Sequence, residues 1–241
     1  MKIIDKIMEK QEKRTNAKSV TIVALGDSVT EGCFECFMHE DGKIGTVFEM
    51  TSSYSARLQE LLAKLYPMVQ VNVVNSGVSG ASLPDIERTM DRDVLSFNPD
   101  LVIVSYGLND CQKGLGGIAE YKERLCAVLE QIKQGGAEII FLTQNYMCTT
   151  VSPHIPEPFL KGLAKTFSES QKAGVLEAYF DAAKEVCLQY GAEVCDLYSV
   201  WKTMDASGVN VTELLSNKLN HPIREYHYYI AIKLLEKMLG V

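Results

Sequence analysis

Short apolar runs rich in β-branched residues alternate along this chain with longer segments whose apolar side chains recur at helical spacing. Most of the short runs are apolar on both faces, as the strands of a parallel sheet covered by helices on both sides must be. The alternation predicts an α/β fold, a three-layer α/β/α sandwich around a five-stranded parallel sheet. If the sheet has the flavodoxin-like strand order 2-1-3-4-5, the first and third strands are neighbours. The expected strands are residues 20–24, 69–74, 101–105, 139–143 and 193–197.

The segments between these runs predict helices that pack on the sheet. A last helix is expected to start after His221 with Pro222 in its first turn, where a missing N–H costs nothing. Residues 144–171 lack a strong period and contain three prolines, which indicates a long loop with one short helix near 160–168. The clearest apolar stripes are Tyr54, Leu58, Leu61, Leu62 and Leu65; Tyr121, Leu125, Val128, Leu129 and Ile132; and Val175, Tyr179, Ala183, Val186 and Tyr190.

The balance of charge argues against a polyanionic partner. The 241 residues carry a formal net charge of -7, and neither sign is gathered into a long run. Nucleic acids and anionic membrane surfaces reward clustered lysine and arginine, so neither is expected to bind. The sequence leaves the oligomeric state open.

The N-terminal segment reads as a charged amphipathic stretch ahead of a single domain. Residues 1–18 mix charges with Ile3, Ile4 and Ile7 and lack the apolar core of a secretory signal, whereas residues 19–241 form the expected domain. No stretch is apolar over the length needed to span a bilayer. Seven cysteines without a disulfide framework are typical of reduced thiols, so a cytoplasmic location is expected, with export after removal of a signal left open.

Four short polar motifs follow the expected strands or begin the last helix. They are GDSVTEG at 26–32, NSGVSG at 75–80, GLND at 107–110 and NHP at 220–222. Taken singly, a serine or asparagine at such a place is also typical of an ordinary helix cap or turn. Because ligands of open α/β sheets bind at the carboxyl edge, the four motifs together predict one site there.

In this order and spacing the motifs resemble the signature blocks of the SGNH/GDSL hydrolases. The resemblance implies that Ser28 is the nucleophile and that His221 is the general base. It also implies that the backbone N–H groups of Ser28 and Gly80 and the side-chain amide of Asn109 form the oxyanion hole. Acyl transfer needs this set of a nucleophile, a base and fixed donors. The resemblance implies no metal and no organic cofactor.

One position departs from the family pattern. The family usually has an aspartate three residues before the histidine, where this chain has Lys218, whose ammonium group cannot accept a hydrogen bond. A backbone carbonyl or the Asn217 side chain could orient the imidazole instead, a distant carboxylate could reach it, or catalysis could be weak. We expect a main-chain acceptor in a Ser28–His221 dyad. Asp27 is expected to organise the turn beside the nucleophile.

Other polar residues have simpler interpretations. Cys33, Cys36 and His39 have ligand-like spacing, but structural zinc normally takes four ligands, so they are expected to line the pocket or to be reduced core thiols. His227 is expected to pack against its neighbours. His154 lies among the prolines of the long loop, where it could touch substrate.

The predicted activity is hydrolysis of carboxylic esters through an acyl-Ser28 intermediate. The resemblance covers enzymes that act on acetylated carbohydrates, lysophospholipids, thioesters and simple esters. An acidic chain without a lipid-binding apolar stripe favours a small-molecule substrate with a short acyl group, with acetyl on a sugar as the leading example. The alternatives are a lysophospholipase or thioesterase of the same family, or a carbohydrate-binding module weakened by the loss of the aspartate.

Overall fold

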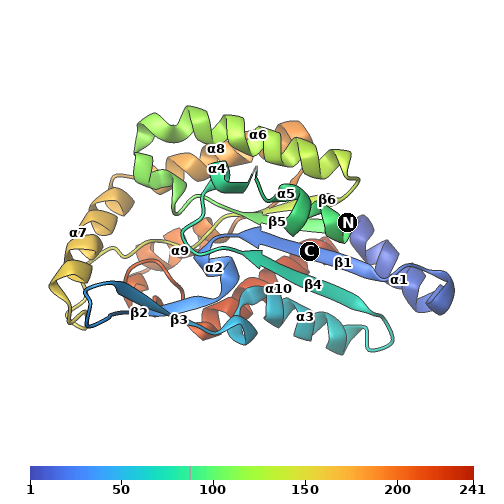
Figure 1. Ribbon diagram of the computed structural model, residues 1–241, viewed down its shortest axis with the longest axis horizontal. Coiled ribbons are helices and arrows are strands. Elements are labelled where there is room, and N and C mark those ends of the chain that lie inside the picture. The colour runs from blue at the N-terminus through green and yellow to red at the C-terminus, as the bar shows by residue number, and fades with distance from the viewer. Residues whose placement is uncertain (87) are drawn as a thin grey trace.

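Five parallel strands in the order β4-β1-β5-β6-β7 form the central sheet of the computed structural model, which describes residues 1–86 and 88–241 (Figure 1). Numbered along the chain, this order is the flavodoxin-like 2-1-3-4-5, and the predicted fold class is confirmed. The strand order reverses direction at β1, so the carboxyl end of β1 lies between those of β4 and β5. The strands are β1 (Val20–Gly26), β4 (Val71–Gly77), β5 (Leu101–Ser105), β6 (Glu138–Leu142) and β7 (Glu193–Cys195).

Helices cover both faces of this sheet. Figure 1 shows α4, α5, α6 and α8 on one side and α3 and α10 on the other, and α6 packs on α8 as α3 packs on α10. All five residues of the apolar stripe predicted between Tyr121 and Ile132 are buried, which confirms that stripe as core. The helices are α1 (Lys2–Lys13), α2 (Ser28–Glu31), α3 (Tyr54–Leu65), α4 (Leu83–Ile86), α5 (Met90–Asp93), α6 (Ile118–Gln134), α7 (Pro158–Lys172), α8 (Val175–Tyr190), α9 (Leu197–Ala206) and α10 (Arg224–Leu239).

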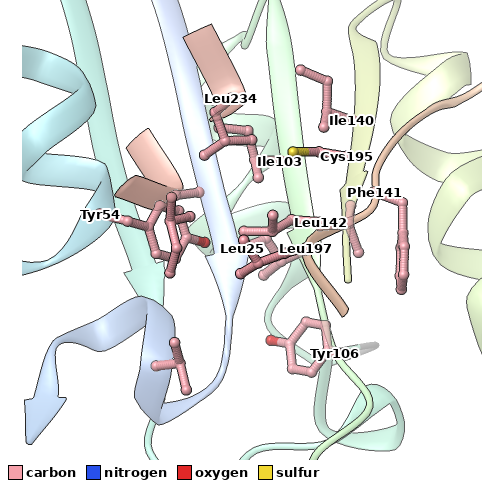
Figure 2. Close-up of a cluster of buried hydrophobic side chains, with 14 of the residues drawn as sticks. Leu25, Tyr54, Ile103, Tyr106, Ile140, Phe141, Leu142, Cys195, Leu197 and Leu234 are labelled. Carbon is pink, nitrogen blue, oxygen red and sulfur yellow. The ribbon is translucent and has the colours of Figure 1, made fainter. Parts of the chain in front are cut away.

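The core between the sheet and α10 is built from alternate strand residues and one helix stripe. Figure 2 shows Leu234 of α10 next to Ile103 of β5. Leu25 of β1 pairs with Val104, so it points to the opposite face of the sheet from Ile103, where it lies near Ile86 of α4. Leu234 and Ile103 are fully buried, and 1% of Leu25 is exposed. Tyr106, just after β5, donates its hydroxyl to the Gly26 carbonyl at 3.0 Å, which ties the ends of two neighbouring strands together.

A β-hairpin that the sequence analysis did not predict follows α2. Its strands β2 (Cys33–Met38) and β3 (Ile44–Phe48) pair antiparallel, and Gly42 (φ +80°) makes the turn between them. The hairpin stands apart from the main sheet at the end where α2 and α7 lie (Figure 1). Its strands are short and half exposed, so they lack the buried apolar run that identified the sheet strands.

Several boundaries in the second half of the chain differ from prediction. The strand expected at 193–197 ends at Cys195, because Leu197 already begins α9. Helix α7 is longer than the expected 160–168, because its buried face continues to Gln171. The predicted place of Pro222 in the first helical turn is wrong: α10 begins at Arg224, and Pro222 pairs with Leu215 in an isolated antiparallel bridge. Hydrogen bonds from Ser216 N to His221 O (2.7 Å) and from Ile223 N to Leu214 O (2.9 Å) hold this stretch extended.

The N-terminal helix α1 docks on the rest of the chain. Ile3 and Ile7 are fully buried, and the N–H groups of Lys2 and Ile3 donate to the Glu138 carboxylate at 3.0 and 2.6 Å. A carboxylate at a helix N-terminus satisfies free N–H groups and the positive end of the helix dipole. Because Glu138 starts β6, α1 covers the amino end of the sheet, opposite the motifs. The domain boundary after residue 18 stays a prediction.

The state of the cysteines and the length of the helices can be compared with what the sequence predicts. All seven cysteines lie within the described residues, and all are free thiols. In the described part of the chain, no helix combines the length and the apolar character that crossing a bilayer demands.

Gly77 and Gly162 give a matched test of how closely α2 lies on the sheet. A Cβ on Gly77 would overlap the backbone of Glu31, lying 2.7 Å from its Cα, whereas a Cβ on Gly162 in α7 would meet no atom within 4 Å. We expect Gly77→Ala to lower the free energy of unfolding by about 2 kcal/mol, because backbone atoms cannot give way. Gly162→Ala is expected to raise it by about 0.5–1 kcal/mol through lost chain entropy. Denaturant unfolding measures both, and equal effects would contradict the close approach.

Candidate active site

Ser28 lies where β1 ends and α2 begins. Asp27 is the N-cap of α2, and its carboxylate accepts a hydrogen bond from Val29 N at 3.0 Å. Gly26 permits this turn because a side chain there would overlap Thr30 and approach the Ser105 carbonyl to 2.9 Å. The turn presents the Ser28 hydroxyl at the carboxyl edge of the sheet, with 6% of the residue exposed.

His221 lies within hydrogen-bond distance of Ser28. Its Nε2 is 2.9 Å from Ser28 Oγ, and its Nδ1 is 3.0 Å from the backbone carbonyl oxygen of Phe34. A carbonyl can only accept, so the Nδ1 nitrogen carries the proton and Nε2 is free to accept from the serine hydroxyl. The imidazole is thereby held in the tautomer that a general base needs.

The loop before His221 is organised by Asn217. Its Oδ1 accepts the N–H groups of Leu219, Asn220 and His221 at 2.9, 2.9 and 3.0 Å. Asn217 thus supports the loop backbone, and the ring is oriented by the Phe34 carbonyl. Lys218, with φ +58°, points its ammonium group at Glu213, 3.0 Å from Oε2, and not at the imidazole.

Burial sets the protonation state of the histidine. It lowers the pKa of His221 to about 4, against the smaller opposing effects of the Phe34 carbonyl and the Glu35 charge. The ring is therefore neutral at neutral pH and available as a base. Burial also raises the pKa of Asp27 to about 7, although hydrogen bonds from the Gln144 side chain and Val29 N oppose the shift.

Gly80 and Asn109 follow the strands on either side of β1. The side-chain amide of Asn109 donates one N–H to the Ala81 carbonyl at 2.8 Å, and its second N–H remains for another acceptor. Gly80 is exposed with φ +78°, and within residues 1–86 and 88–241 its backbone N–H has no acceptor. The Glu31 carboxylate accepts Ser79 N at 2.6 Å and fixes this loop to α2. The oxyanion-hole assignment of Ser28, Gly80 and Asn109 stays a prediction.

Sequence reasoning missed two residues of this site. Gln144 donates to Asp27 Oδ2 at 2.8 Å and accepts Leu108 N at 3.0 Å, so it joins the loops that follow β1 and β5. It comes just after β6, and the strand-end argument used for the other motifs could have found it. Phe34 contributes a carbonyl that any residue type would supply, so no pattern identifies it.

Of the remaining candidates, Cys36 borders this cluster, with its Sγ 3.6 Å from Asn217 Nδ2. Cys33 Sγ lies 3.7 Å from Ser79 Oγ, burial raises the Cys33 pKa to about 12, and Cys36 contacts Thr46. His39 is exposed near the hairpin turn, and His154 is exposed before α7. Within the described residues, no three histidine, cysteine or acidic side chains gather where they could hold a metal ion.

His227 is a packed histidine, as predicted. It is fully buried, its Nδ1 accepts Tyr54 N at 3.1 Å, and its ring lies 5.0 Å from that of Phe34. Burial lowers its pKa to about 3. Accepting at Nδ1 requires its proton on Nε2, which is the opposite tautomer to that of His221.

Comparison with known proteins identifies the family. A model of the GDSL-like Lipase/Acylhydrolase family matches residues 24–227. The chain belongs to this family. It is therefore an ester hydrolase, and the resemblance drawn from the four motifs is confirmed.

Individual relatives include acetylxylan esterases. An acetylxylan esterase of Geobacillus stearothermophilus is 32% identical over 89 residues, which cover 37% of this chain and 39% of that protein. A crystal structure of an acetylxylan esterase from that organism is similar with a TM-score of 0.65 and 20% identity, covering 91% of this chain and 94% of the other. The structure of a putative GDSL-like lipase from Parabacteroides merdae is similar with a TM-score of 0.69 and 18% identity, covering 91% and 95%. At these identities the structures support the fold.

The two buried histidines predict a distinctive ¹⁵N spectrum. At neutral pH we expect His221 to be neutral with its proton on Nδ1, and His227 to be neutral with its proton on Nε2, because their hydrogen-bond partners differ. Long-range ¹H–¹⁵N correlation spectra distinguish the tautomers, and the variants His221→Gln and His227→Gln assign the signals. A proton on Nε2 of His221 would contradict the proposed contact with Phe34.

Proposed function

We propose that this GDSL-family hydrolase is a serine esterase that cleaves short-acyl carboxylic esters, in particular acetyl esters of a carbohydrate or other small molecule, through an acyl-Ser28 intermediate. The contact of 2.9 Å between Ser28 Oγ and His221 Nε2 carries the proposal. A hydroxyl that donates to a neutral, buried imidazole is arranged for nucleophilic attack. The second contact, from Nδ1 to Phe34 O, holds the ring in that role.

The reaction has two acyl-transfer steps. Ser28 Oγ attacks the ester carbonyl as its proton passes to His221 Nε2, and the negative oxygen accepts from Ser28 N, Gly80 N and the Asn109 amide. The intermediate collapses as the imidazolium gives its proton to the leaving alcohol. Water, deprotonated by His221, then attacks the acyl-enzyme and releases the acid and free Ser28.

A dyad in place of a triad has an energetic consequence. The Phe34 carbonyl fixes the tautomer as a carboxylate would, but its dipole stabilises the imidazolium less than a full charge does. The low pKa of His221 has the same cause, because the Phe34 carbonyl and the Glu35 charge oppose the effect of burial only weakly. We infer a working enzyme with slower turnover than one that retains the carboxylate.

The acetyl group is favoured by two independent lines of support. Relatives described as acetylxylan esterases match both by sequence and by structure. The chain is acidic and its sequence has no obvious apolar stripe for binding lipid, which favours short over long acyl chains. A cytoplasmic location belongs to the same proposal, because seven free thiols favour a reducing compartment.

Replacing the dyad tests the mechanism directly. We expect Ser28→Ala to abolish both hydrolysis of p-nitrophenyl acetate and covalent labelling by a fluorophosphonate probe, because no nucleophile remains. His221→Ala is expected to lower kcat by about 10³-fold or more. Asn109→Ala should lower kcat by about 10²-fold through loss of one oxyanion donor.

Matched controls are the exposed residues Ser199, at the start of α9, and His154. Ser199→Ala and His154→Ala are expected to keep wild-type rates. Wild-type rates in both Ser28→Ala and His221→Ala would disprove the dyad. A wild-type protein that neither reacts with the probe nor turns over esters would favour the binding-module alternative.

A series of p-nitrophenyl esters tests the acyl preference. We expect kcat/KM to be highest for acetate and to fall through butyrate to octanoate. A rise toward octanoate would favour the lysophospholipase or thioesterase alternative and would leave the esterase mechanism standing.

A further inference from the structure

The acceptor for His221 lies in an irregular part of the β2–β3 hairpin. The pairing of the two strands shifts register between Cys33 and Cys36, so Phe34 and Glu35 have no paired residue on β3. A bulge of this kind interrupts the ladder and re-aims the backbone beside it. The Phe34 carbonyl is thereby directed at Nδ1 of His221, and its position depends on whatever holds the bulge.

Arg224 contacts the bulge residues Phe34 and Glu35 and also Glu49, at the end of the hairpin. Its Nη1 and Nη2 donate to the two carboxylate oxygens of Glu35 at 2.7 and 3.0 Å. Its Nε donates to Glu49, just after β3, at 2.6 Å. Its guanidinium carbon lies 4.2 Å from the centre of the Phe34 ring. One planar group therefore ties the bulge to the chain that closes the hairpin.

Arg224 is also close to His221 along the chain. It is the first residue of α10 and follows the histidine by three positions. The guanidinium thus connects the backbone that carries the imidazole to the backbone that carries its acceptor. An arginine suits this task because its donors form a rigid fork, whereas a lysine offers one flexible ammonium group.

The side chains that make these ion pairs are only partly buried. About a third of the Arg224 side chain is exposed, as are 42% of Glu35 and 39% of Glu49. Ion pairs at this exposure stabilise a fold little. Their consequence is therefore expected in the placement of the Phe34 carbonyl more than in the melting temperature.

We propose that Arg224 is a positioning residue for the reaction: by clamping Phe34, Glu35 and Glu49 it holds the Phe34 carbonyl against His221, where Lys218 stands in place of the usual aspartate. This inference rests on the proposed Ser28–His221 mechanism. It assigns to an ion-pair cluster behind the site the orienting task that a single carboxylate performs elsewhere in the family.

The test compares Arg224→Met with a control on the same helix. Lys237→Met removes the ion pair of α10 with Glu193 of β7, in the last turn of the helix that Arg224 begins. We expect Arg224→Met to lower kcat for p-nitrophenyl acetate by about 10- to 10²-fold with KM within about twofold, since small displacements of catalytic groups cost this much. Arg224→Lys should fall between Arg224→Met and wild type, and Lys237→Met should match wild type.

Two measurements distinguish a displaced Phe34 carbonyl from a general loss of stability. In Arg224→Met the ¹⁵N signals of His221 should lose their single Nδ1-protonated tautomer, while His227 keeps its own, which depends on Tyr54 N. The acid limb of kcat/KM should move upward toward the ordinary histidine pKa of about 6.5, because the ring gains water and Glu35 loses its partner. Glu35 and His227 are the titratable groups that act on His221 or respond to it.

Each outcome has a distinct meaning. Wild-type kcat, tautomer and acid limb in Arg224→Met would overturn the inference and leave the dyad intact. If Arg224→Met does not fold by circular dichroism, Glu35→Gln keeps the side-chain shape and removes the charge, and wild-type behaviour there would overturn the inference equally. Failure of the dyad itself is seen separately, in wild-type turnover by Ser28→Ala and His221→Ala.

Discussion

The N–H of the buried His221 imidazole donates to a backbone carbonyl. The bond from His221 Nδ1 to Phe34 O decides the tautomer, and the tautomer decides whether Nε2 can accept from Ser28. An unsatisfied donor at this depth would cost a few kcal/mol, so the bond stabilises the buried ring as well as fixing its tautomer. The surrounding loops are arranged to make it.

Close backbone approach at the carboxyl edge of the sheet shapes the turn that carries Ser28. Gly26 and Gly77 let α2 lie directly over the ends of β1 and β4, which no larger residue would allow. Hydrogen bonds through Gln144 and Glu31 then connect α2 and its turn to the loops after β5 and β4. These hydrogen bonds fix the positions of the loops that follow β1, β4 and β5 relative to one another.

Burial governs the charges as well. Asp27 precedes Ser28 in the chain and His221 contacts the Ser28 hydroxyl. Burial moves both groups toward their neutral forms, lowering the pKa of the imidazole and raising that of the carboxyl group. The site therefore presents a neutral base without a carboxylate at its far side. The charges that remain near it, on Glu35 and Arg224, are paired with each other.

The sequence by itself determined the covered parallel sheet and the four motifs at one edge of it, because hydrophobic periodicity and strand-end signals are properties of neighbouring residues. It also placed Ser28 and His221 in one site through family resemblance. Only the tertiary structure decided what orients His221, because the acceptor is a main-chain atom 187 residues away in a hairpin without a buried apolar run. The contacts of Arg224 were hidden for the same reason, because half-exposed ion pairs have no sequence signature until the fold brings their partners together.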